Sequence, residues 1–270
     1  MALTTVGPSP APPRRNPAAA VVRGATPWLL GAATALVLWV LLLELTGTPP
    51  YLAASPAVAF ESFLEEWRTI LDALRVTILE AGSGLAVSTT LALLLAILFT
   101  ALPTAERALM PLALTVRSIP IVAIAPLIVL IAGRGLSTAI VCVTIVTFFP
   151  VLVLAVRGFR SLPNEVVELF RVHGSSEYDL FRYARIPHAV PYIFTGLRVA
   201  GAKGVLGAML AEWLTGNEGL GALLVFAAGR RQIGLLWATL VVATLSAIII
   251  FQLTIAAERR ISRRMTGSGA

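Results

Sequence analysis

The chain has 270 residues, of which 57% are hydrophobic and 13% charged, and its mean hydropathy is +0.87. This balance is far more apolar than that of soluble domains and predicts an integral membrane protein. The net charge of +7 is spread over short connecting segments, which excludes a nucleic-acid-binding surface and is typical of topology signals. The single cysteine, Cys142, excludes an intrachain disulfide framework and a cysteine metal site.

Residues 1–25 are rich in proline and alanine and contain three arginines, a composition that predicts a disordered tail. Pro27–Thr46 follows as about 20 mostly apolar residues, enough to cross the hydrocarbon core of a bilayer. A cleaved signal peptide is the alternative, because small residues suited to cleavage follow at residues 51–57. The apolar run is longer than those of signal peptides, which favours a retained span.

Residues 56–75 carry apolar side chains at three- and four-residue spacing. The pattern predicts an amphipathic helix that lies at the outer membrane surface or against the helix bundle. Its apolar positions are Phe60, Phe63, Leu64, Trp67, Ile70, Leu71 and Leu74. We therefore assign residues 26–75 to the first span and this outer helix.

Five further apolar segments predict transmembrane helices, which with the first make about six spans of an all-α polytopic helix bundle. They are Val76–Ala101, Leu109–Gly133, Ser137–Val156, Val190–Ala211 and Ile233–Ala257. An even number of spans places both termini on one side of the membrane. Arginines are concentrated on that side, so it is predicted to be cytoplasmic. The transmembrane core is assigned to residues 76–260 and a second cytoplasmic tail to residues 261–270.

Glu165–Pro191, between the fourth and fifth spans, is the longest polar passage between two strongly apolar parts of the chain, and residues 158–188 are assigned to a cytoplasmic loop. Pro163 suits the start of a helix and Asn164 its cap. An apolar stripe with helical spacing follows at Val166, Leu169 and Phe170. The passage therefore predicts a short cytoplasmic helix.

A second short helix is predicted after a glycine turn. Gly174 lies where a left-handed residue ends a helix at least cost. Ser176 and Asp179 form a capping-box pattern, and Pro187 is expected to follow the stop of the helix. Such short helices are marginal alone. The pair must therefore pack on its own bundle or dock on a cytoplasmic partner.

This passage resembles a cytoplasmic loop of permease subunits of binding-protein-dependent ATP-binding-cassette (ABC) importers. In that family Glu-Ala-Ala is followed after three residues by Gly and nine residues later by Ile-x-Leu-Pro, and Glu168, Gly174 and Pro187 match this spacing. The departures are Leu169 and Phe170 in place of the two alanines, Ala184 in place of isoleucine and Ile186 in place of leucine.

Three further segments extend the resemblance over about residues 75–260. They are RSIPIVAIAPLIVLIAG (Arg117–Gly133), TGLRVA (Thr195–Ala200) and AEWLTGNEGLGALL (Ala211–Leu224). They look like the branch that imports nitrate, taurine, other sulfonates and pyrimidine thiamin precursors.

The resemblance implies a type I ABC-importer permease, a transport subunit and not an enzyme, in the plasma membrane of a bacterium. The implied partners are an ATPase that receives the loop helix, an extracytoplasmic binding protein and a second permease copy, identical or related. The chain has no GxxxxGK[ST] phosphate loop, so it is expected to bind no cofactor itself, and ATP to bind to the ATPase. The expected coupling residues are Glu168, Leu169, Phe170, Gly174, Ser175, Ser176 and Pro187.

Ionisable and proline residues inside the predicted spans identify a candidate solute path. A helix interrupted by prolines must face protein or water, and an ionisable group costs about 2.5–3.5 kcal/mol to insert into a bilayer. The third span contains Pro111, Pro120 and Pro126 around Arg117. The predicted path residues are Arg117, Pro120, Arg198, Lys203 and Glu212. Two interpretations remain open: pairing within the chain, with Glu212 as the counter-charge of Arg117, or contact with an anionic solute.

Two features in and after the fifth span each allow two structural interpretations. Small residues recur at every fourth position, at Gly196, Ala200, Gly204 and Ala208, a pattern that suits either the seam between two copies or the core of one. The glycine-rich segment Thr215–Gly221 suits a re-entrant turn at the outer face or a plain surface loop.

A secondary carrier that is not coupled to an ATPase is the alternative function. Such a carrier would need no docking loop, so an ATPase partner distinguishes the two. His173 and His188 have no metal-ligand spacing, and the sequence predicts no catalytic or metal-binding residue.

Overall fold

A computed structural model describes residues 17–216 and 218–265, and every regular element in them is helical. The elements are α1 (Pro17–Thr46), α2 (Pro56–Glu65), α3 (Trp67–Ala101), α4 (Pro103–Ser118), α5 (Ile121–Ala132), α6 (Leu136–Arg160), α7 (Asn164–Val172), α8 (Glu177–Leu180), the π-helical turn η1 (Phe181–Arg185), α9 (Ile186–Thr215), α10 (Leu220–Gly229) and α11 (Ile233–Met265). The predicted all-α fold is confirmed. The sequence predicts tails at residues 1–25 and 261–270, but residues 17–25 are helical in α1 and residues 261–265 are helical in α11. The remaining tail residues, 1–16 and 266–270, lie outside the described residues.

The chain divides into two units, residues 1–57 and 58–270. The first unit contains α1, in which the predicted span Pro27–Thr46 lies, and its apolar portion with described side chains is Leu30–Thr46. The helix ends where Gly47 adopts a left-handed φ of 58°.

The second unit contains the long apolar helices. Within the described residues, four helical segments are long and apolar enough to cross a membrane, and the bent pair α4 and α5 makes a fifth if it is counted as one broken span. The four are Trp67–Ala101, Leu136–Arg160, Glu177–Thr215 and Ile233–Ile261. Leu30–Thr46 is a shorter apolar helix, so the total of six spans stays a prediction.

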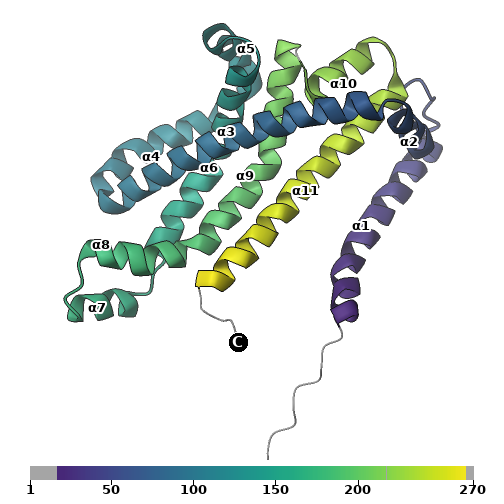
Figure 1. Cartoon of the computed structure of the whole chain (residues 1–270). Helices are drawn as coiled ribbons and strands as arrows, with labels where there is room; N and C mark the ends of the chain where they lie inside the picture. The colour runs from purple at the N-terminus through teal and green to yellow at the C-terminus, as the bar shows by residue number, and fades with distance from the viewer. Residues whose placement is uncertain (1–16, 217, 266–270) are drawn as a thin grey trace, which may run out of the picture. The chain divides into compact units, whose positions relative to one another are not determined.

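The centre of the second unit is α6, which packs extensively against both α3 and α9, and α11 packs on the α9 side (Figure 1). The main core cluster lies where α3, α6 and α9 meet. Its buried residues are Ala92, Ala96, Phe99, Val151, Leu152, Ala155, Val156, Phe159, Ala189 and Ala200. Half of them are alanines, so the helices approach closely here.

The small-residue stripe of α9 belongs to this core and not to an outer seam. Gly196, Ala200, Gly204 and Ala208 are all buried within the single chain. A Cβ placed on Gly196 would lie 3.1 Å from Cα of Val151 in α6. The core interpretation of the stripe is therefore confirmed, and the seam interpretation is wrong.

The third predicted span is not one helix. The axes of α4 and α5 differ by 100°, and the break falls at Ile119 and Pro120. Proline has no N–H to donate and restricts the residue before it to extended backbone, which Ile119 adopts with a ψ of 124°. Pro111 and Pro126 lie inside α4 and α5 without ending them.

The predicted outer helix and the second span are also joined differently from the prediction. α3 begins at Trp67 and runs without a break to Ala101, so the second half of the amphipathic segment is the start of a spanning helix. A change from amphipathic to apolar composition does not interrupt backbone hydrogen bonds, and no proline lies in this stretch. Ile70 is fully buried in a cluster with Leu220 and Leu223 of α10, and Phe63 and Leu74 pack against this cluster. This part of the amphipathic segment therefore packs against the bundle, whereas Phe60, Leu64 and Trp67 are exposed.

We predict that Gly196→Val destabilises the protein and that Gly82→Val does not. A valine at Gly196 would press against the backbone of α6, and overpacking of this kind costs about 1–3 kcal/mol. Gly82 is also helical, but no atom lies within 4 Å of a Cβ placed there. The apparent Tm of the two variants, measured by size exclusion after heating in detergent, checks the prediction. Equal Tm values would contradict the close approach of α6 and α9.

Candidate functional site

The polar passage after α6 forms a short helix that starts at a proline. Pro163 has an extended ψ of 140°, and its carbonyl accepts hydrogen bonds from the N–H groups of Val166 and Val167 at 3.1 and 3.3 Å. α7 begins at the next residue, Asn164, whose side chain makes no cap. The predicted helix is confirmed, but Asn164 as its cap is wrong because Pro163 occupies the capping position.

The glycine turn after α7 has the predicted geometry. Gly174 adopts a left-handed φ of 67°, and the N–H of Ser175 donates to the carbonyl of Phe170 at 3.0 Å. The Oγ of Ser176 accepts the N–H of Asp179 at 3.1 Å, and the Asp179 carboxylate accepts the N–H of Ser176 at 3.2 Å. The capping box that starts α8 is therefore confirmed.

The predicted stop before Pro187 is wrong. α8 continues through η1 into α9, so Glu177–Thr215 is a single helical segment of 39 residues. Within η1 the N–H of Ile186 donates to the carbonyl of Phe181, five residues earlier. Pro187 is the second residue of α9, directly after this π-helical turn, and its missing N–H does not end the helical segment. α8 is thus joined to a long apolar helix without a loop between them.

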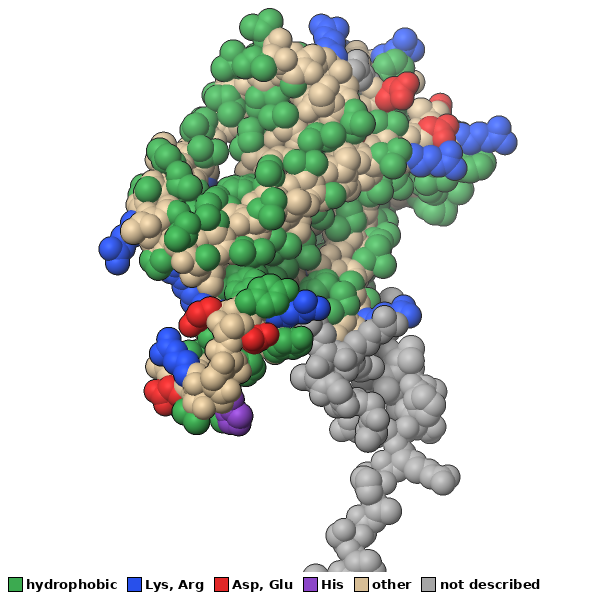
Figure 2. Space-filling view, turned by 60° about the vertical axis from the view of Figure 1, so that its left-hand side comes forward, with side chains coloured by type: hydrophobic (Ala, Val, Ile, Leu, Met, Phe, Trp, Pro, Cys, Tyr) green, Lys and Arg blue, Asp and Glu red, His purple; other side chains and the backbone are tan. Residues whose placement is uncertain are grey.

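α7 projects from the bundle with an exposed apolar surface. Leu169 is 55% exposed and Val172 84% exposed, and among the described helices none packs extensively against α7. Figure 1 shows α7 and α8 at the end of the bundle where α11 finishes, and Figure 2 shows acidic and basic side chains around apolar ones on this projection.

The structure gathers six of the seven predicted coupling residues on the projection. Phe170 and Ser175 are half-buried there, whereas Pro187 is half-buried at its base. The exposed members are Glu168, Leu169, Gly174 and Ser176.

A second candidate site is a cavity of about 490 Å³ between α4, α5, α6 and α9, which we call the cationic cavity. Its residues are Val116, Arg117, Ile119, Ile121, Ile145, Val146, Phe149, Pro150, Val153, Leu154, Val199 and Lys203. Arg117 comes from the last turn of α4 and Lys203 from the middle of α9, so the fold brings together two predicted path residues. Pro120 sits at the break between Ile119 and Ile121, both of which line the cavity.

Arg117 does not pair with Glu212. Its guanidinium lies over the ring of Phe149, 4.9 Å from the ring centroid. Among the described residues, neither Arg117 nor Lys203 makes an ion pair with a carboxylate. The hypothesis that Glu212 is the counter-charge of Arg117 is therefore wrong.

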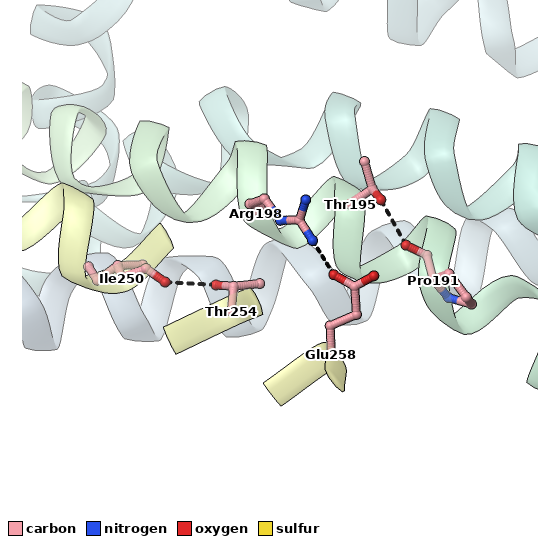
Figure 3. Close-up of polar contacts among 6 residues, drawn as sticks. All are labelled: Pro191, Thr195, Arg198, Ile250, Thr254 and Glu258. Atoms are coloured by element: carbon pink, nitrogen blue, oxygen red, sulfur yellow. Dashed lines mark hydrogen bonds and ion pairs between the residues drawn. The ribbon is translucent and has the colours of Figure 1, made fainter. Parts of the chain in front are cut away.

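Arg198 is neutralised on another side of α9. Its guanidinium forms an ion pair with Glu258 of α11 (Figure 3). It also lies 5.7 Å from the centroid of the Phe251 ring. Arg198 is not among the residues that line the cationic cavity. Sequence reasoning missed Glu258, although a carboxylate at the end of an apolar segment is a natural partner for an arginine inside one.

Glu212 fastens the glycine-rich turn that follows α9. It is 1% exposed, and its carboxylate accepts the N–H of Gly221 at 2.6 Å. The neighbouring N–H of Leu220 donates to Oγ1 of Thr77 in α3 at 2.9 Å. The carboxyl group of Glu80, a buried residue of α3, lies beside that of Glu212. Glu212 is thus absent from the lining of the cationic cavity.

Sequence reasoning also missed Glu80, although an ionisable residue inside a predicted span was the available signal. The segment Thr215–Gly221 leads from α9 into the short helix α10, which packs on α9, α11 and α3. Gly216 and Gly219 adopt positive φ values of 64° and 112° within it. The segment therefore turns the chain back onto the bundle.

Permease proteins of known transport systems are similar to this chain in sequence. The chain is 32% identical over 84% of its length, and 86% of the relative's, to the riboflavin transport system permease protein of Chloroflexus aurantiacus. It is 33% identical over 69% of its length, and 74% of the relative's, to the formylaminopyrimidine transport permease protein of Halalkalibacterium halodurans.

The fold is similar to that of a solved transporter chain. A chain of the MetNI methionine ABC transporter in an inward-facing conformation matches 73% of this chain and 94% of its own length, with a TM-score of 0.54 and 21% identity.

The model of the family described as binding-protein-dependent transport system inner membrane component matches residues 88–267. This match identifies the chain as a member of that family, a multi-pass permease subunit of an ABC importer whose ATPase is a separate subunit.

Proposed function

We propose that this permease couples to its ATPase through α7 and carries its solute past the cationic cavity. The single observation that supports the coupling role is that α7 leaves Leu169 and Val172 exposed while it packs extensively on none of the other described helices. An apolar surface on a short helix gains stability when a partner's groove covers it. The coupling residues are Glu168, Leu169, Phe170, Gly174, Ser175, Ser176 and Pro187.

The continuous helix from Glu177 to Thr215 is the proposed route by which coupling reaches the membrane. The capping box fixes α8 to the glycine turn, and η1 joins α8 to α9 without a loop. A displacement of α7 by the ATPase is therefore delivered to α9, which carries Lys203. A flexible linker at this point would absorb the displacement instead.

A second permease copy is the proposed other half of the path, and a related permease could take its place. Arg117 and Lys203 are exposed in the single chain although they lie within apolar helical segments. Charged side chains are costly against lipid tails, so this face is expected to meet a second copy or water.

The binding protein is expected at the opposite end of the bundle from α7, where the turns flanking α10 lie (Figure 1). Both chain termini are then cytoplasmic in the plasma membrane of a bacterium. The relatives named above transport riboflavin and formylaminopyrimidine by name, and we expect a small solute here too. The chain itself is expected to bind no cofactor, because ATP is held by the ATPase.

We predict that Leu169→Ser combined with Val172→Ser reduces binding of the cognate ATPase at least about tenfold, because two apolar contacts are lost. Co-purification of the full-length permease with the ATPase measures the binding. The fold should be unaffected, since both side chains are exposed.

Leu52→Ser is the matched control. Leu52 is 63% exposed, close to the 55% of Leu169, but it lies in the segment between α1 and α2, which is predicted to be on the outer side. Normal co-purification of the double variant, or equal loss in the control, would contradict the assignment of α7 as the docking helix.

A second prediction concerns orientation. In a Cys142→Ala background, a cysteine at Glu218 should react with an impermeant thiol reagent in intact cells, and a cysteine at Val172 should react only after the cells are opened. Both positions are exposed, and Cys142 is fully buried, so accessibility decides the labelling. Labelling of Val172→Cys in intact cells would overturn the proposed orientation.

A further inference from the structure

We infer that the cationic cavity binds a compact organic anion, a carboxylate or sulfonate with a small apolar body, through Arg117 and Lys203. This inference rests on the proposed solute path and assigns its substrate class. In this cavity two cations from different helices line a common space, and no carboxylate is among the lining residues.

Of the three ionisable residues in the membrane part of α9, two have partners within the protein and Lys203 has no ion-pair partner among the described residues. Arg198 is neutralised by Glu258, and Glu212 is used by the turn into α10. Lys203 faces the cavity, and no described acidic side chain forms an ion pair with it. Because the neighbouring charges have partners within the protein and Lys203 has no ion-pair partner among the described residues, Lys203 is available to bind an anion transiently.

Arg117 is held but not neutralised. Phe149 offers its ring to the guanidinium at 4.9 Å, and this contact uses none of the five N–H donors of the arginine. Those donors can therefore still bind oxygen atoms of an anion. Two cations on one cavity also repel each other, and an anion between them removes this repulsion.

The apolar character of the other lining residues favours an organic anion over an inorganic one. Apart from Arg117 and Lys203, every lining residue is apolar. A bare inorganic ion would lose hydration against these walls without compensation, whereas an apolar body would gain from them. The volume of about 490 Å³ falls in the usual range for small-molecule sites.

The test uses the full-length chain in lipid nanodiscs and two probes with the same body, butanesulfonate and butanesulfonamide. Isothermal titration calorimetry should detect binding of the charged probe and none, or binding at least about tenfold weaker, of the neutral one. Equal binding of the two probes overturns the inference. So does displacement of butanesulfonate by chloride at equal concentration, which indicates a site for inorganic anions.

Variants locate the site. Arg117→Gln and Lys203→Gln should each weaken butanesulfonate binding about tenfold, and Lys203→Arg should restore most of it. Arg68→Gln, which removes an exposed cation at the start of α3, should leave binding unchanged. Size exclusion and Tm establish that each variant is folded. Unchanged binding in folded Arg117→Gln and Lys203→Gln overturns the inference.

An anionic lipid headgroup is the other source of the same chemistry. The titration is therefore repeated in discs of phosphatidylcholine alone and in discs that also contain phosphatidylglycerol. Equal affinity in both supports a solute site, whereas loss of butanesulfonate binding with phosphatidylglycerol assigns the cavity to lipid and overturns the inference. None of these measurements involves the ATPase, so they can fail while coupling through α7 holds, and the reverse.

Discussion

A hydrocarbon environment supplies no hydrogen-bond partner and no counter-charge, so every polar group inside the bundle must find one in the protein or face water. This constraint explains most of the polar geometry of α9. Arg198 reaches Glu258 of the neighbouring helix, and Glu212 reaches the backbone of the turn into α10. Under the same constraint Lys203 indicates a functional site, because its side chain lines a cavity and does not pair with a carboxylate of a neighbouring described helix.

The polar passage after α6 and the cationic cavity are connected by one helical segment, Glu177–Thr215. The glycine turn connects α7 to α8, the capping box starts α8, and α8 is continuous with α9. α9 in turn lies against α6 at the distance that glycine permits. A partner that moves α7 therefore acts on one wall of the cavity without any need to alter the chemistry of that wall.

Local structure was the most predictable part of this chain. Gly174 and the Ser176 and Asp179 pair depend only on neighbouring residues, so their turn and capping geometry could be predicted from the sequence. The continuation past Pro187 could not, because a proline is compatible with a stop and also with the first turn of the next helix. The π-turn of η1 has no sequence signal of comparable strength.

Pairing of charges was the least predictable part. Arg117 and Glu212 were both recognisable as ionisable groups in spans, but their partners depend on which face of each helix turns inward. Arg117 meets Phe149, and Glu212 meets Gly221 and Glu80, contacts that require the packing of α6, α3 and α10 to be known. The cationic cavity combines residues from four helices. The sequence analysis assigned two of them, Arg117 and Lys203, to the solute path but could not predict that they line the same cavity.

The break at Pro120 has a consequence for how the cavity can change its shape. Phe149 and Lys203 lie on α6 and α9, whose backbones are in close contact. Arg117 lies in the last turn of α4, just before the 100° bend where α4 and α5 meet at a residue without an N–H. The two charges therefore lie on different helices, and a change of the angle at this bend would change the spacing between them. The affinity for the proposed anion would then change although neither charge does.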